Sequence, residues 1–128
     1  MNIPENLYYT QEHEWVRVES DDLVVVGITD FAQKELGDIV YIEVETEGEE
    51  LEKDEEFGSV EAVKTVSDLF MPISGEVIAV NEALEDEPEM INAAPYEAWI
   101  IKIKPSNLQE ELGGLMNAAD YRGLIDAS

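Results

Sequence analysis

The chain has 128 residues, which suits one domain, and 45% of them are hydrophobic, so a folded protein is expected instead of a disordered one. Its formal net charge is −24, from 31 acidic residues against seven Lys and Arg, and a field of this sign repels nucleic acid and anionic membranes. The chain has no cysteine, which excludes disulfides and thiol chemistry of its own.

The acidic balance favours partners with basic docking faces, and the alternative is that it only keeps the protein soluble. No apolar run approaches the roughly 20 residues of a membrane span. The opening segment, MNIPENLYY, has neither a basic start nor an apolar stretch, so no targeting peptide is expected. The simplest interpretation is a cytoplasmic bacterial or archaeal protein, and a mature organellar protein is the alternative.

The first third of the chain carries patterns for two strands and a short helix. Glu14–Glu19 alternates apolar and polar residues, and Leu23–Ile28 is a more apolar run, so two strands joined by a turn are expected. Thr29–Leu36 has helical spacing, with Asp30 as the expected N-cap and Gly37 as the expected end.

Strand patterns then alternate with acidic connections. The connection at 46–56 is expected to be solvated, with a short pairing segment around Leu51, and the one at 82–92 is expected to be a loop with room for one helical turn. Pro72 lacks an amide hydrogen and marks a strand end. Further strands are expected at Gly37–Glu45, Phe57–Ala62, Thr65–Met71, Gly75–Asn81 and Trp99–Lys104.

The end of the chain is helical. Ser106 and Gln109 have capping-box spacing ahead of a short helix, which Gly113-Gly114 interrupts, and Asn117 is the expected cap of a final helix. The whole pattern predicts a mainly β fold of short strands with helices covering one end.

Lys64 is the residue that local rules explain least. Val63-Lys64 lies between two strand patterns, where a tight turn would normally use Asn-Gly or a similar pair. Sequences that break a local rule often do so for function. The residues alone leave two interpretations open, a lysine that keeps the hairpin soluble or blocks edge pairing, and a lysine with a chemical task.

Several sequence segments that occur in a fixed order along the chain surround this lysine. They are HEWV at His13–Val16, GITDFAQKELGDIVYIE at Gly27–Glu43, FGSVEAVKTVSD at Phe57–Asp68, PISGEVIAVN at Pro72–Asn81 and WIIKIKP at Trp99–Pro105. Together these segments resemble sequences of the glycine cleavage system H-protein family. The lipoyl-lysine segment of that family matches the residues around Lys64. The resemblance runs from about Leu7 to Tyr121.

The resemblance implies a lipoyl-domain-type flattened β-barrel or sandwich (a barrel-sandwich hybrid) with short helices, including a C-terminal one. It would form a single domain over 1–128, with a lipoyl-like core at about 14–104 and a helical extension at 105–128. Lipoate would be attached covalently to Lys64. Glu61 and Gly75 stand at the positions, three before and eleven after the lysine, that help a lipoate ligase or transferase recognise its target.

The implied function is that of a carrier protein, not an enzyme, in glycine catabolism and one-carbon metabolism. The lipoyl arm would move an aminomethyl group from a pyridoxal-phosphate glycine decarboxylase to an aminomethyltransferase, and dihydrolipoyl dehydrogenase would reoxidise the dithiol. A monomer is expected. Two alternatives stay open: a relay that delivers lipoyl groups to 2-oxoacid dehydrogenases, and an unmodified structural β-domain.

The resemblance also implies a cleft in which carboxylates face the cationic amine of the loaded arm, an arrangement that is favourable electrostatically. Glu14 and Asp68 match cleft positions, and Glu12 matches one that carries a small hydroxyl residue in some members. Glu35 stands where some members have a cleft histidine. The alternatives are a surface carboxylate for Glu14 and a turn-stabilising side chain for Asp68.

His13 is the only histidine, and without cysteine it cannot form a zinc site of the usual kind. A local packing or turn role is expected for it. Trp15 and Trp99 are expected in the core. The sequence contains no phosphate-binding glycine loop, no metal-ligand motif and no nucleophile–base pair, so no catalytic site is predicted.

Overall fold

The computed structural model describes residues 2–127 and is mainly β. Its strands are β1 (Tyr8–Tyr9), β2 (Glu14–Ser20), β3 (Leu23–Ile28), β4 (Ile39–Glu43), β5 (Glu50–Leu51), β6 (Glu56–Ala62), β7 (Val66–Phe70), β8 (Gly75–Val80) and β9 (Ile101–Pro105). Its helices are α1 (Asp30–Leu36), α2 (Ala83–Asp86), α3 (Met90–Ala93), α4 (Leu108–Leu112) and α5 (Ala118–Asp126).

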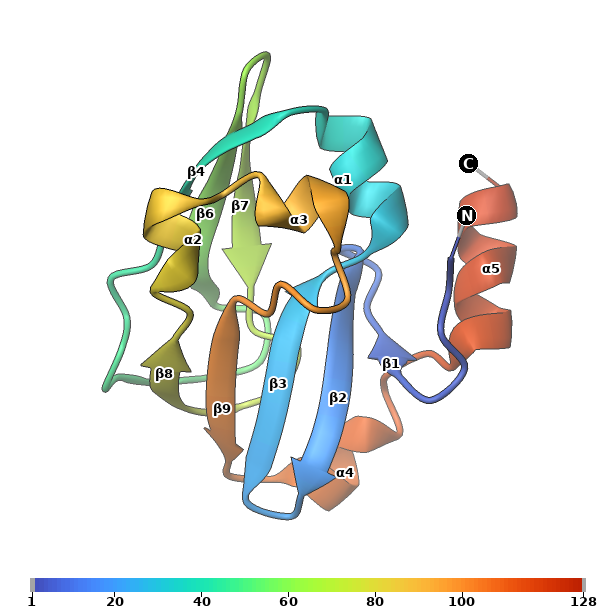
Figure 1. The fold of residues 1–128 in the computed structure, drawn as a ribbon. Helices are drawn as coiled ribbons and strands as arrows, with labels where there is room; N and C mark the ends of the chain where they lie inside the picture. Colours follow the sequence, from blue (N-terminus) through green and yellow to red (C-terminus); the bar gives the residue numbers. More distant parts are fainter. Residues whose placement is uncertain (1, 128) are drawn as a thin grey trace.

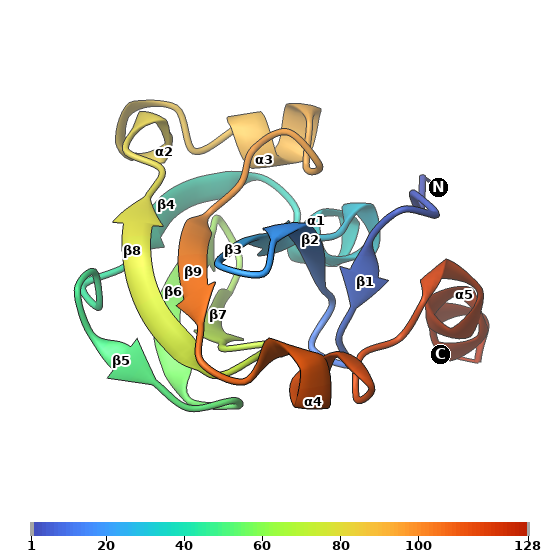
Figure 2. The same cartoon turned by 90° about the horizontal axis from the view of Figure 1, so that it is seen from below.

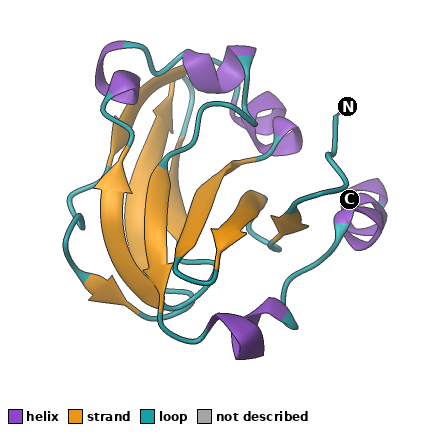
Figure 3. Ribbon diagram, turned by 60° about the horizontal axis from the view of Figure 1, so that its bottom comes forward, coloured by secondary structure: helices purple, strands orange, loops and turns teal. Residues whose placement is uncertain are grey.

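Within these residues the strands form two antiparallel sheets (Figure 1). One sheet has six strands in the order β1-β2-β3-β9-β8-β5, and the other has three in the order β4-β6-β7. The two sheets pack against each other, and the helices lie around their margins (Figures 2 and 3). This is the predicted flattened β-sandwich with short helices and a C-terminal helix.

The core explains why β3 is an unbroken apolar run. Val24 and Val26 face the three-stranded sheet and belong to the main core, which also contains Val60 of β6. Val25 faces the opposite way, into a second cluster with Trp15 and Tyr121 of α5. Both faces of this strand are therefore covered, which removes the polar alternation of a half-exposed strand.

The start of α1 differs from the prediction. The N-cap is Thr29, whose Oγ1 accepts a hydrogen bond from the Ala32 amide at 3.2 Å, and Asp30 is the first helical residue. Asp30 instead accepts a hydrogen bond from Gln33 Nε2 at 2.7 Å. Gly37 ends the helix as predicted, with φ at +81° and its amide bonded to the Gln33 carbonyl. This positive φ is the backbone conformation that favours glycine.

Other differences lie in the peripheral segments. The two-residue strand β1 has too few residues for a periodic pattern, and it was not predicted. The segment 82–92 contributes to two short helices, α2 and α3, where at most one helical turn was expected. The predicted capping box at Ser106 is wrong, because α4 begins after Asn107 without a side-chain cap. Asn117 caps α5 as predicted, accepting from the Asp120 amide at 2.8 Å.

Candidate functional site

Lys64 lies at the tip of the hairpin that joins β6 to β7 (Figure 1). The Ala62 amide donates to the Thr65 carbonyl at 2.8 Å, so only Val63 and Lys64 form the loop. Among the described residues, the non-glycine residues with positive φ lie elsewhere, so this loop is not one of the left-handed turns that Asn-Gly serves. The absence of such a turn removes the objection to Val-Lys at this place.

The tip rests against the end of α1 instead of standing free. The Val63 amide donates to the Asp38 carbonyl at 3.0 Å. A Cβ placed on Gly37 would lie 3.3 Å from Lys64 Cε and 3.7 Å from Nζ, so the lysine side chain passes over a glycine. In the described part of the chain Lys64 has no ion-pair partner and is exposed to solvent. Its amine is therefore accessible for covalent modification.

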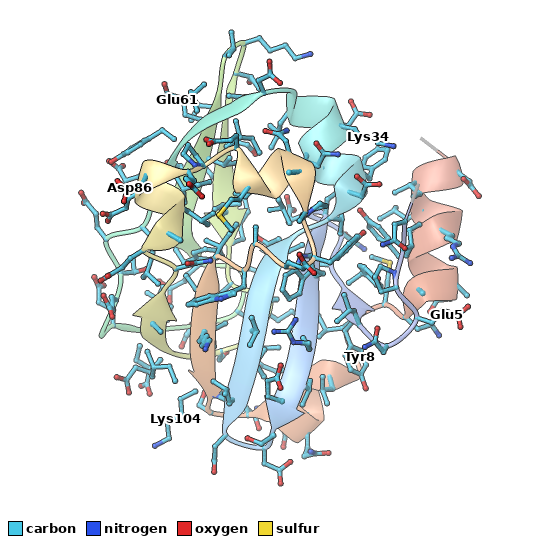
Figure 4. All side chains as sticks on the ribbon, in the orientation of Figure 1. Glu5, Tyr8, Lys34, Glu61, Asp86 and Lys104 are labelled. Carbon is cyan, nitrogen blue, oxygen red and sulfur yellow. The ribbon has the colours of Figure 1, made fainter. Side chains whose placement is uncertain are left out.

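Glu61 lies beside this lysine on the outer face of the three-stranded sheet. It pairs with Tyr41 on β4 and with Val66 on β7, and all three side chains are exposed. Figure 4 shows Glu61 projecting from the hairpin near its tip. The predicted recognition residue and the predicted modified lysine are thus neighbours on one surface.

Gly75 lies far from this surface. It opens β8 at the end of the molecule opposite to the hairpin tip (Figure 1). A Cβ there would collide with the Lys104 carbonyl oxygen and would lie 2.6 Å from Ile103 Cγ2, so only glycine fits against β9. The structure thus gives Gly75 a packing role that is separate from the tip.

A cleft of about 300 Å³ lies between α1 and β7. Glu12 and Asp68 both line it, together with Glu35, so the structure brings together two of the three predicted arm-cleft residues. Apolar side chains form much of its wall; they are Ile28, Phe31, Leu36, Val60 and Leu69. The cleft combines an apolar channel with carboxylates at its border, which suits an aliphatic chain that ends in a cation.

Glu14 lies outside this cleft, in a neighbouring pocket of about 250 Å³ that it shares with Glu12, Phe70 and Lys53. Its side chain is only 2% exposed. Oε2 accepts a hydrogen bond from the Phe70 amide at 2.9 Å, and Oε1 has no hydrogen-bond partner among residues 2–127. Burial raises the pKa of Glu14 to about 8, against the lowering effect of the Phe70 amide.

Glu14 is therefore not the surface carboxylate that remained open as an alternative. A carboxyl group with this pKa is mostly protonated at neutral pH and can donate as well as accept a hydrogen bond. The buried Oε1 belongs to a side chain that lines a pocket, so a group bound there can form a hydrogen bond with it.

His13 packs locally, as expected. It has φ at +66°, and its Nδ1 lies 2.9 Å from the Tyr121 hydroxyl. Its ring contacts Phe31, with ring centroids 4.7 Å apart. Burial lowers the pKa of His13, although the nearby Glu12 and Glu35 carboxylates oppose this. Trp15 is fully buried as predicted, whereas Trp99 is only partly buried and lies under the Lys102 ammonium.

Sequence reasoning missed two features of the tip. Gly37 was assigned only to ending the helix, yet it also makes room for the lysine side chain. Tyr41 was counted as a strand residue, and its exposure depends on a bulge in β4 between Ile39 and Tyr41 that no sequence pattern indicates. The burial of Glu14, by contrast, could have been predicted from the sequence. Glu14 and Val16 are alternate residues of β2, so their side chains lie on the same face of the sheet.

The described residues were also searched for a metal site and for a membrane-spanning helix. Residues 2–127 contain no group of three His, Cys, Asp or Glu side chains that could hold a metal ion. None of the helices that the structure describes has the length and apolar character that crossing a bilayer requires.

Comparisons with known proteins agree with this geometry. The family model described as "Glycine cleavage H-protein" matches residues 7–128. A glycine cleavage system H protein of Bacteroides fragilis is 52% identical, over 99% of this chain and 100% of that protein. A probable glycine cleavage system H protein of Pyrococcus furiosus is 60% identical, over 93% and 89%.

The fold is also similar to that of a known crystal structure. The glycine cleavage system H protein of Mycobacterium marinum superposes with a TM-score of 0.86 at 38% identity, over 94% of this chain and 97% of that one. The sequence match and the structural match cover the same nearly complete length. The chain therefore belongs to the glycine cleavage H-protein family, the lipoyl carriers of the glycine cleavage system.

Proposed function

We propose that this chain carries lipoate in amide linkage on Lys64 and serves glycine cleavage as a mobile carrier. It would collect the aminomethyl group at glycine decarboxylase, deliver it to aminomethyltransferase and present its dithiol to dihydrolipoyl dehydrogenase. The observation that carries this proposal is an accessible lysine at a two-residue hairpin loop, inside the segment that the family shares. The chemistry at each stop belongs to the partner enzymes.

The residues around Lys64 fit the group. Lipoate, when bound, supplies a disulfide that this cysteine-free chain lacks, and with it group-transfer and redox chemistry. The amine is exposed and has no ion pair in the described residues, so acylation sacrifices no salt bridge. The α1–β7 cleft offers the apolar wall that a hydrocarbon arm needs.

We further propose roles for the carboxylates. From Lys64, the free edge of β7 leads first to the cleft lined by Asp68 and Glu12, and then to the pocket of Glu14. Asp68 and Glu12 would attract a cationic amine at the cleft, and Glu14 would hold a hydrogen-bonded group where water is scarce. Glu61 would contact the lipoate ligase, and Gly75 would act through the packing of β8 against β9.

We also infer that residues 1–128 act as one carrier domain. Tyr9 of β1 stacks on Tyr121 of α5, with ring centroids 4.7 Å apart, and both belong to the cluster beneath Trp15. The C-terminal helix thus shares its core with the sheet, which favours folding as a unit.

Reconstitution with glycine decarboxylase tests the function. Lipoylated protein is expected to support glycine-dependent exchange of carbon dioxide, whereas the unlipoylated protein and Lys64→Arg are expected to give only the background of the enzyme alone. Equal exchange with and without lipoate would contradict the proposal. Failure of exchange together with lipoyl transfer to a 2-oxoacid dehydrogenase would favour the relay alternative.

A further inference from the structure

Three polar side chains form a continuous chain of hydrogen bonds from α5 to the wall of the α1–β7 cleft. The Tyr121 hydroxyl of α5 lies 2.9 Å from His13 Nδ1 and 2.7 Å from Thr29 Oγ1. Thr29 Oγ1 also accepts a hydrogen bond from the Ala32 amide at 3.2 Å. Thr29 and Tyr121 are both 0% exposed, so neither can exchange these partners for bulk water. The geometry of this chain decides where each hydroxyl proton lies.

Only one direction of donation satisfies all three groups. The Thr29 hydroxyl has one proton to donate, and among the described residues the Tyr121 oxygen is its acceptor. Tyr121 must then donate its own proton to His13 Nδ1. Burial raises the pKa of Tyr121 to about 12, so its hydroxyl keeps that proton at neutral pH. His13 Nδ1 is therefore an acceptor, and the proton of the neutral ring is on Nε2.

Protonation of His13 would reverse the chain. A protonated imidazole donates from both nitrogens, so Nδ1 would donate to Tyr121 and Tyr121 would donate to Thr29. The Thr29 hydroxyl proton would then be buried without an acceptor in the described part of the chain, which is unfavourable. The chain thus favours the neutral ring. Burial acts in the same direction and lowers the pKa of His13, although the Glu12 and Glu35 carboxylates oppose it.

The His13 ring also lines the α1–β7 cleft. It lies there beside Phe31, with ring centroids 4.7 Å apart, and the carboxylates of Glu12, Glu35 and Asp68 line the same cleft. Under the proposed function, on which this step rests, the group received by the cleft ends in an ammonium ion. A positive charge on His13 would offset the carboxylates and favour the uncharged amine.

The charge of this amine governs how long the cargo lasts. Once the ammonium group has lost its proton, the nitrogen lone pair can form a C=N bond while the C–S bond breaks and sulfur leaves with the electron pair. Sulfur then takes up a proton, and water adds to the carbon to release formaldehyde and ammonia. A neutral ring beside three carboxylates keeps the amine protonated and slows this loss.

We infer that Tyr121 is a positioning residue for the α1–β7 cleft: with Thr29 it holds His13 in the neutral Nε2–H form, so that the wall facing the cationic cargo carries no positive charge. Tyr121 does not itself line the cleft and acts through His13. The C-terminal helix α5 therefore contributes to the site from behind its wall.

Nuclear magnetic resonance of the unmodified protein tests the assignment directly, because His13 is the only histidine and gives one set of imidazole nitrogen signals. In the wild type, Nδ1 should carry no proton and should couple across the hydrogen bond to the Tyr121 hydroxyl proton. In Tyr121→Phe, this coupling should vanish and the pKa of His13 should rise, because the neutral ring loses the hydrogen bond that favours it.

Tyr9→Phe is the matched control. Tyr9 is also 0% exposed and stacks on Tyr121, with ring centroids 4.7 Å apart, but its hydroxyl donates to the Pro4 carbonyl. This variant loses a buried hydroxyl from the same aromatic pair without touching His13. It should leave the imidazole signals and the pKa of His13 unchanged.

A second readout follows the cargo. Lipoylated proteins are loaded with glycine and glycine decarboxylase, separated from the enzyme, and assayed for released formaldehyde. Tyr121→Phe should release it about fivefold faster than the wild type, the usual net contribution of one hydrogen bond, whereas Tyr9→Phe should match the wild type. Thermal melting checks folding, and if Tyr121→Phe does not fold, the wild-type nitrogen signals decide the matter.

A wild-type ring with its proton on Nδ1 would overturn the inference. Unchanged signals in a folded Tyr121→Phe, or equal formaldehyde release by that variant and the wild type, would overturn it as well. A wild type that cannot be lipoylated or loaded would instead contradict the proposed function, and the nitrogen signals of the unmodified protein would still decide the role of Tyr121.

Discussion

The two ends of β7 differ in how far a nearby ionisable side chain is exposed to solvent. At the tip, Lys64 is solvent-exposed between the bare side chains of Val63 and Val66. At the base, the Phe70 amide holds the carboxyl group of Glu14, which is 2% exposed and has a pKa raised to about 8. One short strand thus connects a group exposed to solvent with a group withdrawn from water.

The contrast shows how a carrier can separate attachment from protection. Covalent attachment requires access by another protein, and access leaves apolar surface uncovered. Shielding a cargo requires a dry pocket, and a dry pocket shifts the protonation of any acid within it. The α1–β7 cleft lies between the two ends, so under the proposed function the same edge of the sheet would serve both needs.

Glu14→Gln should produce the largest change at the base of β7. The folded state keeps the proton that the unfolded chain loses near pH 4.5, so stability is intact below that pH and falls as pH rises towards about 8. Gln carries no charge to bury, so the variant should become more stable than the wild type at pH 9, by up to about 5 kcal/mol. Urea unfolding at pH 4 and pH 9 measures this, and equal pH dependence of the two proteins would contradict it.

Leu69→Ala should be the next largest change. Leu69 is 3% exposed and belongs to the main core, and truncating such a leucine typically costs about 3 kcal/mol. Urea unfolding at one pH provides the measurement. A cost below about 1 kcal/mol would show that the base of β7 is less tightly packed than the structure indicates.

Gly37→Ala sharpens the account of the tip. Gly37 has φ at +81° and ψ at −155°, a region nearly restricted to glycine, so alanine there costs about 1–3 kcal/mol, and the new methyl group would lie 3.3 Å from Lys64 Cε. The lysine side chain should move off α1, so the rate of lipoylation should change more than stability does. Gly48→Ala is a matched control, because Gly48 also has positive φ but has open space around it. Equal lipoylation rates in the two variants would refute this role of Gly37.

Val66→Ser should be the smallest change in stability. It lies on the same strand as Leu69 but is 60% exposed, and substitutions at such surface positions stay within about 0.5 kcal/mol. Thermal melting beside Leu69→Ala gives the comparison directly. A large loss of stability for Val66→Ser would mean that this exposed position supports the fold.

Much of this contrast was predictable from sequence, though unevenly. Local patterns located β2, β3 and the two arms of the hairpin, because alternation and short apolar runs are local properties of the chain. The burial of Glu14 was predictable in principle, since it shares a face with Val16. The prediction placed Glu14 with Asp68 in one cleft, whereas the structure puts it in the adjoining pocket, a distinction that depends on packing between sheets.

Other features depend on contacts that no local pattern contains. Asp30 and Thr29 are both good N-caps, and the backbone alone decides which of them precedes the first turn. The contact of Gly37 with Lys64 joins residues from two elements that meet only in the folded chain. The exposure of Tyr41 follows from a bulge, which shifts the parity of a strand without a sequence signal.

The most direct test of the central claim is the intact mass of the protein after incubation with lipoate ligase, ATP and lipoate, followed by peptide mapping. The wild type should gain the mass of one lipoyl group, located on the peptide that contains Lys64, and Lys64→Arg should gain nothing while the other lysines remain available. An unmodified wild type, or a Lys64→Arg protein that gains the same mass, would contradict the assignment of Lys64 as the carrier residue.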